Sequence, residues 1–363
     1  MSELKRILQE SIAHDGPMAL DTFMAVCLGH SRHGYYMTRD PFGVKGDFVT
    51  APEISQMFGE LIGLWAAEVW MRLGAPDQVH LVELGPGRGT LMADALRAAR
   101  VSNEFSSALH VHLVETSPVL QQMQQETLAQ SPVPVTWHAS LETIPEGPAI
   151  FIANEFFDCL PVRHYVKAAQ GWCQRLVGLN AQGELSFGLS ADPEPLLTMD
   201  APDGAVLELS PASQLFMGQL AGRIAKGQAA ALIIDYGHGE TGYGETLQAL
   251  RAHKSVSPLE CPGEADLTAH VDFAALTRAA QTAGADVFGP VMQGELLMRL
   301  GIAQRADALK KRATDDQARA IDLALARLVT ERVGEAPGMG KLFKALALVP
   351  KGASVPPGFV REG

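Results

Sequence analysis

A glycine-rich turn between a predicted strand and a predicted helix is the feature that most constrains this chain. Residues 79–84 (VHLVEL) form a short apolar run, which is typical of a buried parallel strand. The sequence GPGRG at 85–89 breaks this run, and apolar residues then recur at helical spacing from Thr90 to Ala99. This order of strand, glycine turn and helix predicts the nucleotide-binding half of a doubly wound α/β fold.

The spacing of the glycines discriminates between ligands. Gly85, Gly87 and Gly89 follow the pattern G-x-G-x-G, whereas dinucleotide sites use G-x-G-x-x-G and P-loops continue with Lys-Ser or Lys-Thr. Pro86 also removes one N–H donor from the turn. These features disfavour a pyrophosphate and favour S-adenosylmethionine, which offers an amino-acid carboxylate and a ribose. An ordinary glycine-rich turn in an α/β protein is the alternative interpretation.

A second strand that ends on an acidic residue follows downstream. Residues 110–114 are predicted as a buried strand, and Glu115 comes directly after it. An acidic residue at this tip, about 20 or more residues after the glycines, can accept hydrogen bonds from both ribose hydroxyls. Ser117 and Pro118 then suit the N-cap and the first position of a helix. Glu115 therefore strengthens the prediction of S-adenosylmethionine, with a solvated loop carboxylate as the alternative.

Composition excludes several classes of function. Of the 363 residues, 47% are hydrophobic and 19% charged, as in a well-packed folded chain. The net charge of -12 argues against a nucleic-acid surface, which needs clustered Lys and Arg, but it is compatible with a basic protein segment as substrate. No apolar run is long enough to span a membrane and no signal peptide is visible, so we expect a cytoplasmic protein without membrane insertion. The sequence leaves the oligomeric state open.

Metal binding is not predicted. The four cysteines form no C-x-x-C pair, so we expect reduced thiols and no structural zinc. His110 and His112 share one face of a predicted strand, but no third ligand is evident near them. Histidines with a structural role are therefore the favoured interpretation.

The pattern of elements predicts a helical or lid region over residues 1–75 and an α/β core over residues 76–363. Amphipathic patterns predict helices over 2–13, 20–28 and 54–73 within the first region. The core is predicted to carry insertions at about 161–210 and about 240–335. Period-two patterns in the first insertion predict short antiparallel strands. The second is expected to contain a loop over 242–267 followed by helices over 273–284, 293–300 and 305–333.

Polar residues follow further predicted strands of the core. Asn154 comes after the apolar run 149–153, and Asp235 after a similar run that ends at Ile234. Ligands of open α/β sheets bind beyond the carboxyl ends of the strands, so Gly85, Glu115 and Asn154 should converge there. A last apolar run at 342–349 could insert into the sheet beside an earlier strand.

These motifs resemble those of the MidA-type class I S-adenosylmethionine-dependent methyltransferases. That family includes a mitochondrial complex I assembly factor that acts as a protein arginine methyltransferase. The matching segments run in order along nearly the whole chain: 34–36 (GYY), 46–48 (GDF), 50–55 (TAPEIS), 83–90 (ELGPGRGT), 114–115 (VE), 153–161 (ANEFFDCLP) and 234–237 (IDYG).

The resemblance implies a Rossmann-like seven-stranded sheet whose last strand is antiparallel, with a helical N-terminal extension over the site. It also implies methyl transfer from S-adenosylmethionine to a protein arginine, on a subunit of NADH dehydrogenase in the mitochondrial case. A mitochondrial presequence is missing, which suggests a bacterial member of the family.

The cofactor site is predicted at the glycine turn and at the ends of the following strands. The glycines should hold the methionine part, Glu115 the ribose, and Ser140 with Leu141 the adenine. Asn154 stands where cofactor and methyl acceptor can both be reached. The predicted cofactor-binding residues are Glu83, Gly85, Gly87, Gly89, Glu115, Ser140, Leu141 and Asn154.

The predicted catalytic residues are Asn154, Glu155 and Asp158. An arginine is a planar fork of donors that carboxylates hold well, so Glu155 and Asp158 are predicted to orient it and one of them to take its proton. Carboxylates at a helix N-terminus are the alternative interpretation of this pair.

Other carboxylates compete for this role. Asp47 and Glu53 are alternative acceptor carboxylates in the N-terminal loop, unless they serve turns and caps. Asp235 either contacts the substrate or caps a turn.

Two alternatives to an arginine methyltransferase stay open. A small-molecule methyltransferase would need a closed apolar pocket, whereas a protein substrate needs an open groove. A non-catalytic S-adenosylmethionine-binding assembly factor would be favoured by degenerate glycines or by loss of Glu115, and neither is seen.

Overall fold

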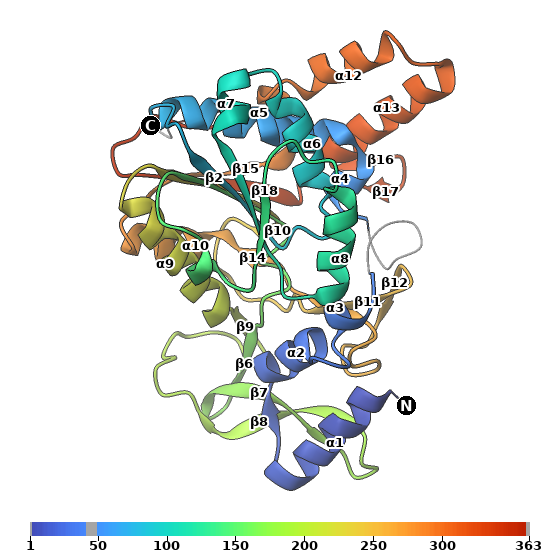
Figure 1. The fold of residues 1–363 in the computed structure, drawn as a ribbon. Coiled ribbons are helices and arrows are strands. Elements are labelled where there is room, and N and C mark those ends of the chain that lie inside the picture. The colour runs from blue at the N-terminus through green and yellow to red at the C-terminus, as the bar shows by residue number, and fades with distance from the viewer. Residues whose placement is uncertain (1, 41–48, 361–363) are drawn as a thin grey trace. The chain divides into compact units, whose positions relative to one another are not determined.

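A computed structural model describes residues 2–40 and 49–360, which divide into two units (Figure 1). Unit 1 is drawn from Met1–Phe48, Asp158–Phe216 and Glu240–His270, and unit 2 from Val49–Phe157, Met217–Gly239 and Val271–Gly363. This division differs from the predicted boundary at residue 75, because the helices over residues 51–72 pack with unit 2. The predicted insertion at 161–210 falls in unit 1, and the one at 240–335 is shared between both units.

A seven-stranded sheet forms the centre of unit 2, in the order β15-β18-β10-β5-β2-β3-β4. Neighbouring strands from β10 to β4 are parallel, whereas β18 is antiparallel to both β10 and β15. Its strands are β2 (Val79–Leu84), β3 (Leu109–Val114), β4 (Val135–His138), β5 (Ala149–Asn154), β10 (Ala229–His238), β15 (Asp286–Met292) and β18 (Phe343–Val349). The predicted fold class and the antiparallel last strand are confirmed. The sequence analysis did not predict β15, and a short β14 (Val271–Asp272) pairs with the end of β10.

Helices surround this sheet in unit 2. They are α4 (Ala51–Ile54), α5 (Gln56–Arg72), α6 (Thr90–Ala99), α7 (Asn103–Ala108), α8 (Pro118–Thr127), α10 (Phe273–Thr282), α11 (Gln293–Arg299), α12 (Ile302–Lys310) and α13 (Asp315–Val329). A 3-10 turn, η1, covers Leu141–Thr143, and β16 (Arg332–Val333) pairs with β17 (Ala336–Pro337). Among the described residues, no helix is long and apolar enough to cross a membrane.

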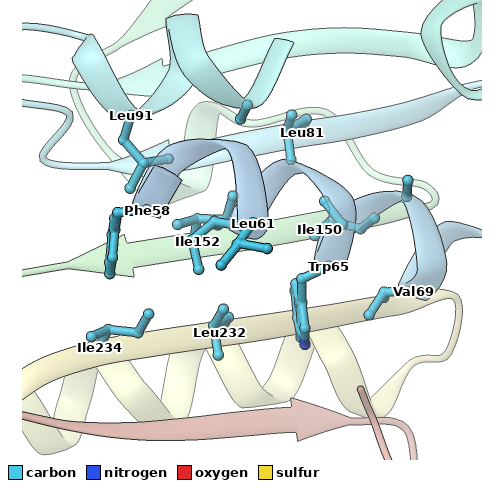
Figure 2. Packing of buried hydrophobic residues seen from close by; sticks show 14 of the residues in the cluster. Phe58, Leu61, Trp65, Val69, Leu81, Leu91, Ile150, Ile152, Leu232 and Ile234 are labelled. Carbon is cyan, nitrogen blue, oxygen red and sulfur yellow. The ribbon is translucent and has the colours of Figure 1, made fainter. Parts of the chain in front are cut away.

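Helix α5 supplies one side of the main hydrophobic core. Phe58, Leu61 and Trp65 are almost completely buried, and Figure 2 shows them facing strand residues such as Ile152 and Leu232. Their spacing of three and four residues places them on one face of the helix. A main part of the core of unit 2 therefore lies between α5 and the sheet. The α5 residues that form it recur at the helical spacing from which this helix was predicted.

Two predicted helices are each interrupted in the structure. The predicted helix over 54–73 is interrupted at Ser55, whose hydroxyl caps the start of α5 by accepting a hydrogen bond from the Met57 N–H. The predicted helix over 305–333 is divided into α12 and α13, because Thr314 forms a capping box with Gln317, and it ends at Val329, before β16. Both breaks follow from a hydroxyl side chain that satisfies free N–H groups at a helix start.

Unit 1 combines small helices with two antiparallel sheets. Its helices are α1 (Glu3–Asp15), α2 (Leu20–Gly29) and α3 (Tyr35–Thr38), and α9 (Pro211–Ala225) begins in unit 1 and ends in unit 2. One sheet has five strands: β1 (Met18–Ala19), β6 (Arg163–Ala168), β7 (Gly171–Leu179), β8 (Leu185–Pro193) and β9 (Val206–Leu209). The other has β11 (Gln248–Arg251), β12 (Lys254–Val256) and β13 (Asp266–Thr268), so the expected loop over 242–267 is wrong. These strands have three or four residues, too few for a period of two to be detected.

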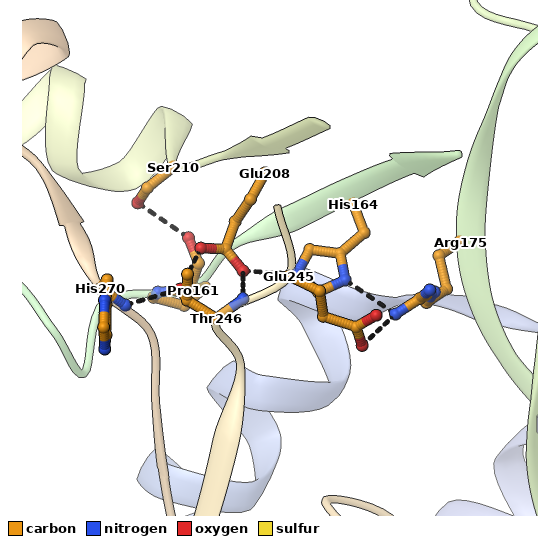
Figure 3. Close-up of polar contacts among 8 residues, drawn as sticks. All are labelled: Pro161, His164, Arg175, Glu208, Ser210, Glu245, Thr246 and His270. Atoms are coloured by element: carbon orange, nitrogen blue, oxygen red, sulfur yellow. Dashed lines mark hydrogen bonds and ion pairs between the residues drawn. The ribbon is translucent and has the colours of Figure 1, made fainter. Parts of the chain in front are cut away.

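A charged network connects the five-stranded sheet of unit 1 with the segment that leads into β11 (Figure 3). His164 is completely buried, with Nε2 lying 2.6 Å from Glu208 Oε2 and Nδ1 accepting from Arg175 at 3.1 Å. A guanidinium only donates, so the proton of the neutral ring is on Nε2. Thr246 donates to Glu208 through its hydroxyl, and Glu245 pairs with Arg175. Burial opposes ionisation of Glu208, but the hydrogen bonds from His164 and Thr246 outweigh it and lower its pKa.

Candidate functional site

Strand register brings the predicted site residues to one edge of the sheet. Leu84 is paired with Val114 on β3 and with Ala153 on β5. Each of these three residues directly precedes a predicted site residue, namely Gly85, Glu115 and Asn154. The site in unit 2 therefore starts at the aligned carboxyl ends of β2, β3 and β5, as expected for an open α/β sheet.

The glycine turn has a backbone that other residues adopt only with strain. Gly85, Gly87 and Gly89 have φ angles of 61°, 55° and 80°. A Cβ on Gly85 would also lie 3.0 Å from Cδ2 of Phe156. The ten-residue helix α6 begins directly after the turn, so its first N–H groups face the same edge. The turn thus offers close backbone approach and N–H donors for a carboxylate.

Glu83 supports the turn from the buried side. Its side chain lies in the interior, where burial raises the pKa to about 8, although a hydrogen bond from the Met92 N–H opposes this shift. Met92 lies in the first turn of α6, so Glu83 contributes to holding the helix start. Its Oε2 atom is buried without a hydrogen-bond partner among the described residues.

Glu115 is held by hydrogen bonds on both oxygens. Oε1 accepts from the Ser117 N–H at 2.8 Å, and Oε2 accepts from Gln124 Nε2 at 3.1 Å. Burial raises the pKa of Glu115 in spite of these contacts. A carboxylate oxygen accepts more than one hydrogen bond, so both oxygens keep capacity for the hydroxyls of a ribose.

Gln124 is a site residue that the sequence analysis missed. Its side chain is completely buried on α8 and donates to the Gly87 carbonyl at 2.8 Å as well as to Glu115. Its Oε1 accepts from Trp137 Nε1 at 2.9 Å. The sequence did contain an indication of its role. Gln124 lies four residues after Leu120, so its polar amide falls on the apolar face of the helix that packs against the core.

The predicted adenine segment is anchored by a second missed residue. Arg223 of α9 donates to the carbonyls of Leu141 and Ile144 at 3.1 and 3.0 Å, and to that of Pro145 at 2.6 Å. The guanidinium also lies 5.6 Å from the ring centroid of Phe151. Arg223 therefore fixes the segment that starts at Ser140, although it is distant in sequence.

Asn154 and Glu155 form a polar pair at the end of β5. Asn154 Nδ2 donates to Glu155 Oε1 at 3.2 Å, and the same oxygen accepts from the Ala51 N–H at 3.1 Å. Asn154 Oδ1 is buried and has no hydrogen-bond partner among the described residues. Glu155 has a φ of 51°, which is uncommon for a residue with a side chain and is typical of functional sites.

Glu53, an alternative carboxylate for binding the substrate arginine, is already engaged by two residues at the glycine turn. It accepts from the Thr90 hydroxyl at 2.5 Å and pairs with Arg88 Nη1 at 3.3 Å. Arg88 lies in the glycine turn and Thr90 begins α6, so Glu53 fastens α4 to the predicted cofactor site. Asp47, the other alternative, lies outside the described residues.

The two remaining predicted carboxylates, Asp235 and Asp158, belong to different units. Asp235 is completely buried and accepts from the N–H groups of Phe156 and Phe157 at 3.1 and 2.9 Å and from that of Tyr236 at 2.9 Å. Of its two predicted roles, this geometry is that of a turn cap. Asp158 belongs to unit 1, where its carbonyl accepts from the Ala269 N–H. Of the three predicted catalytic residues, the structure brings Asn154 and Glu155 together in unit 2, whereas Asp158 belongs to unit 1.

Histidines of three strands form a hydrogen-bonded row in unit 2. His112 Nε2 lies 2.9 Å from His80 Nδ1, and His112 Nδ1 lies 2.8 Å from His138 Nε2. Burial, together with the neighbouring histidines, lowers the pKa of His112 to about 4. Across residues 2–40 and 49–360, no three His, Cys, Asp or Glu side chains are placed to hold a metal ion.

The described residues fit S-adenosylmethionine. The turn at 85–89 suits the close approach of a carboxylate, and Glu115 suits a ribose diol. The unpartnered Oδ1 of Asn154 can accept from an amino group near the turn. This sheet order, with a glycine turn after β2 and a buried acid after β3, defines an S-adenosylmethionine-dependent methyltransferase.

Comparison with known proteins gives the particular family. Residues 61–291 match the model of a family described as putative S-adenosyl-L-methionine-dependent methyltransferases, and the chain belongs to that family. Protein arginine methyltransferase NDUFAF7 of Mus musculus is 37% identical over 345 residues, which cover 88% of this chain and 79% of that protein. The Drosophila melanogaster homologue is 36% identical and covers 96% of this chain and 85% of its own length.

A solved structure supports the same cofactor. A Burkholderia thailandensis protein bound to S-adenosyl-homocysteine has a TM-score of 0.85 and 29% sequence identity, and the match covers 98% of this chain and 93% of that one. The protein is therefore an S-adenosylmethionine-dependent methyltransferase.

Proposed function

We propose that this methyltransferase modifies an arginine side chain of a protein, and that this protein is a subunit of NADH dehydrogenase. The pair of Asn154 and Glu155 at the end of β5 is the structural observation that carries the proposal. The relatives from Mus musculus and Drosophila melanogaster, which match most of this chain, are named protein arginine methyltransferases. The choice of NADH dehydrogenase rests on the resemblance of the sequence motifs to the MidA-type family.

Glu155 is suited to hold a guanidinium in one orientation. Hydrogen bonds from the Ala51 N–H and from Asn154 Nδ2 both reach its Oε1 and restrain the carboxylate. A restrained carboxylate can accept N–H groups of the planar guanidinium and so direct one nitrogen towards the methyl group. Bound S-adenosylmethionine supplies an electrophilic methyl group on a sulfonium that leaves as a neutral thioether.

The acceptor nitrogen must also lose a proton. Arginine is protonated at neutral pH, so a proton leaves the guanidinium during or after formation of the new N–C bond. Glu155 is the carboxylate at the end of β5 that can take it, while Asp235 is occupied by backbone N–H groups. Glu155 therefore combines orientation with proton acceptance in this proposal.

Binding of the cofactor is tested first by calorimetric titration with S-adenosylmethionine and with S-adenosyl-homocysteine. We expect saturable binding of both. Methyl transfer is then measured by mass spectrometry of arginines in NADH dehydrogenase purified from a strain that lacks this protein. Wild-type protein should add methyl groups to an arginine there.

Glu155→Gln should lose about 100-fold or more of that methyl transfer, the size of effect typical for a residue that transfers a proton. Its affinity for S-adenosyl-homocysteine should stay within a few-fold of wild type. Glu126→Gln, at an exposed position of α8, is the matched control. Full activity in Glu155→Gln would remove this residue from the mechanism, and absence of any methylated arginine would contradict the proposed substrate.

A further inference from the structure

Strand β8 forms one free edge of the five-stranded sheet of unit 1 (Figure 1). It pairs with β7 over Leu185–Leu189 and again at Pro193, and no second strand lies beside it within the described residues. In an antiparallel sheet, alternate residues of such an edge turn their N–H and C=O groups away from the paired strand. The outer edge of β8 therefore carries backbone groups that an added strand can bind.

The middle of β8 is apolar and exposed. Phe187 and Leu189 are 39% and 45% exposed, and Gly188 between them has no atom within 4 Å of the position of a Cβ. Phe187 and Leu189 lie on the same face of the strand because they are two residues apart. Arg175 of β7 packs against the Phe187 ring, with 5.3 Å between the guanidinium carbon and the ring centroid.

The first part of this edge lacks the features that usually protect free strands. Natural edge strands carry Lys, Pro or a bulge that prevents further pairing. Between Leu185 and Leu189, β8 has no Lys, Arg or Pro and pairs regularly with β7, and the register shift and Pro193 come only after Leu189. The stretch Leu185–Leu189 is therefore expected to pair with another extended segment.

The charge around β8 specifies the kind of segment. Residues 176–222 contain no Lys or Arg, and they include six acidic residues: Glu184, Asp192, Glu194, Asp200, Asp203 and Glu208. Glu184 directly precedes β8 but is paired with Lys5 of α1 at 2.7 Å, whereas Asp192 lies near the end of β8 and Glu194 follows the strand. A basic segment would find these last two acidic side chains beyond the apolar stretch Leu185–Leu189.

A second copy of this chain fits the edge less well. Symmetric pairing of two β8 strands would bring together two copies of the stretch 176–222, each with six acidic residues and no Lys or Arg. Repulsion between like charges opposes such an approach. The charges therefore favour a basic partner over self-association.

We propose that the free edge of β8 binds an extended, basic segment of the protein substrate as an additional strand. The proposal rests on the proposed function, because it takes the partner to be the protein whose arginine is methylated. Backbone hydrogen bonds would supply affinity, and alternation of apolar and basic side chains would supply specificity.

Binding can be tested with a labelled peptide and the full-length protein saturated with S-adenosyl-homocysteine. The probe is a nine-residue peptide of alternating Val and Arg, matching the nine residues of β8. Fluorescence anisotropy should show saturable binding that weakens with salt. A peptide with Glu in place of Arg, and one with a central Pro, should bind at least tenfold more weakly. Equal binding of the Pro-containing peptide would overturn the added strand.

Leu189→Lys places a charge on the edge and should weaken binding of the Val-Arg peptide about tenfold, which corresponds to about 1.4 kcal/mol. Leu323→Lys is the matched control, because Leu323 is 62% exposed on α13 of unit 2. Circular dichroism checks that both variants fold. Unchanged affinity in Leu189→Lys would overturn the proposal. So would a wild-type dimer in sedimentation that Leu189→Lys dissociates, since a second copy would then occupy the edge.

Failure of this proposal is separable from failure of the proposed function. If NADH dehydrogenase is methylated on arginine, Leu189→Lys should raise the KM for that acceptor about tenfold, and an unchanged KM would count against β8. If no arginine is methylated at all, the proposed function fails. The anisotropy measurement then still decides whether the edge of β8 binds a basic strand.

Discussion

Glu83 shows how one side chain can link the predicted site to stability. The carboxyl is buried beneath the glycine turn and bonded to the Met92 N–H, and burial raises its pKa from 4.5 to about 8. The folded chain therefore keeps a proton that the unfolded chain loses as the pH rises above 4.5. The contribution of Glu83 to stability is full below pH 4.5 and is lost as the pH rises to about 8.

Glu83→Gln should remove this pH dependence, because the amide does not titrate but still offers an acceptor to the Met92 N–H. Relative to wild type, the variant should gain stability from pH 4.5 to pH 8, by at most about 1.4 kcal/mol for each pH unit. Urea unfolding at the two pH values measures the difference. A constant difference between variant and wild type would show that Glu83 is ionised in the folded chain.

Gln124 joins three parts of the candidate site through one amide. Gln124→Leu would leave the Gly87 carbonyl, Glu115 Oε2 and Trp137 Nε1 without this partner. We expect a loss of about 1–3 kcal/mol in unfolding free energy, the cost of leaving buried polar groups unpaired, together with weaker binding of S-adenosyl-homocysteine. Calorimetry and urea unfolding measure both effects. The control Gln122→Leu removes an exposed amide of the same helix, and an equal loss there would contradict the assignment.

At the scale of elements, three parallel strands align His80, His112 and His138 into a hydrogen-bonded row. Sequence analysis identified one face that carries His110 and His112, but neither His80 nor His138 could be joined to them. The row depends on which strands are neighbours, and sheet order is a property of the folded chain. Of the two histidines on that face, His112 belongs to the row.

Protonation of the row should destabilise the folded chain. Since folding lowers the pKa of His112 from 6.5 to about 4, the stability it contributes is present above pH 6.5 and is lost as the pH falls towards 4. His112→Gln should reduce this loss, by at most about 1.4 kcal/mol for each pH unit. Urea unfolding at pH 6.5 and pH 4 tests this, with exposed His14→Gln as control. The same slope in His112→Gln and wild type would contradict it.

At the scale of the whole molecule, the described residues that fit the cofactor belong to unit 2, whereas the free β8 edge belongs to unit 1. Each unit has its own hydrophobic core. Both units are assembled from segments that are separate in the chain. Local composition therefore did not show that residues 49–75 belong to unit 2, and the predicted boundary at residue 75 differs from the observed division. Residues 49–75 pack with the sheet because α5 covers its apolar face, which is a tertiary contact.

Binding of S-adenosyl-homocysteine should protect unit 2 selectively. At about 100 times its Kd, a ligand stabilises the unit that binds it by about 2.7 kcal/mol. Hydrogen exchange of the full chain, followed by mass spectrometry, should show slower exchange in peptides from β2, β3 and β5. Peptides from α2 and β7 in unit 1 serve as the internal comparison. Equal additional protection in both units would contradict this prediction.

The sequence by itself determined the doubly wound core, the glycine turn and the acid after the second strand, because strand periodicity and backbone freedom are local properties. It also placed Gly85, Glu115 and Asn154 at strand ends. Only the tertiary structure decided the contacts of Gln124 with Gly87 and of Arg223 with Leu141, which join residues 37 and 82 positions apart in the sequence. It likewise gave Asp235 the role of a turn cap, since the N–H groups it binds become neighbours only when β5 and β10 pair.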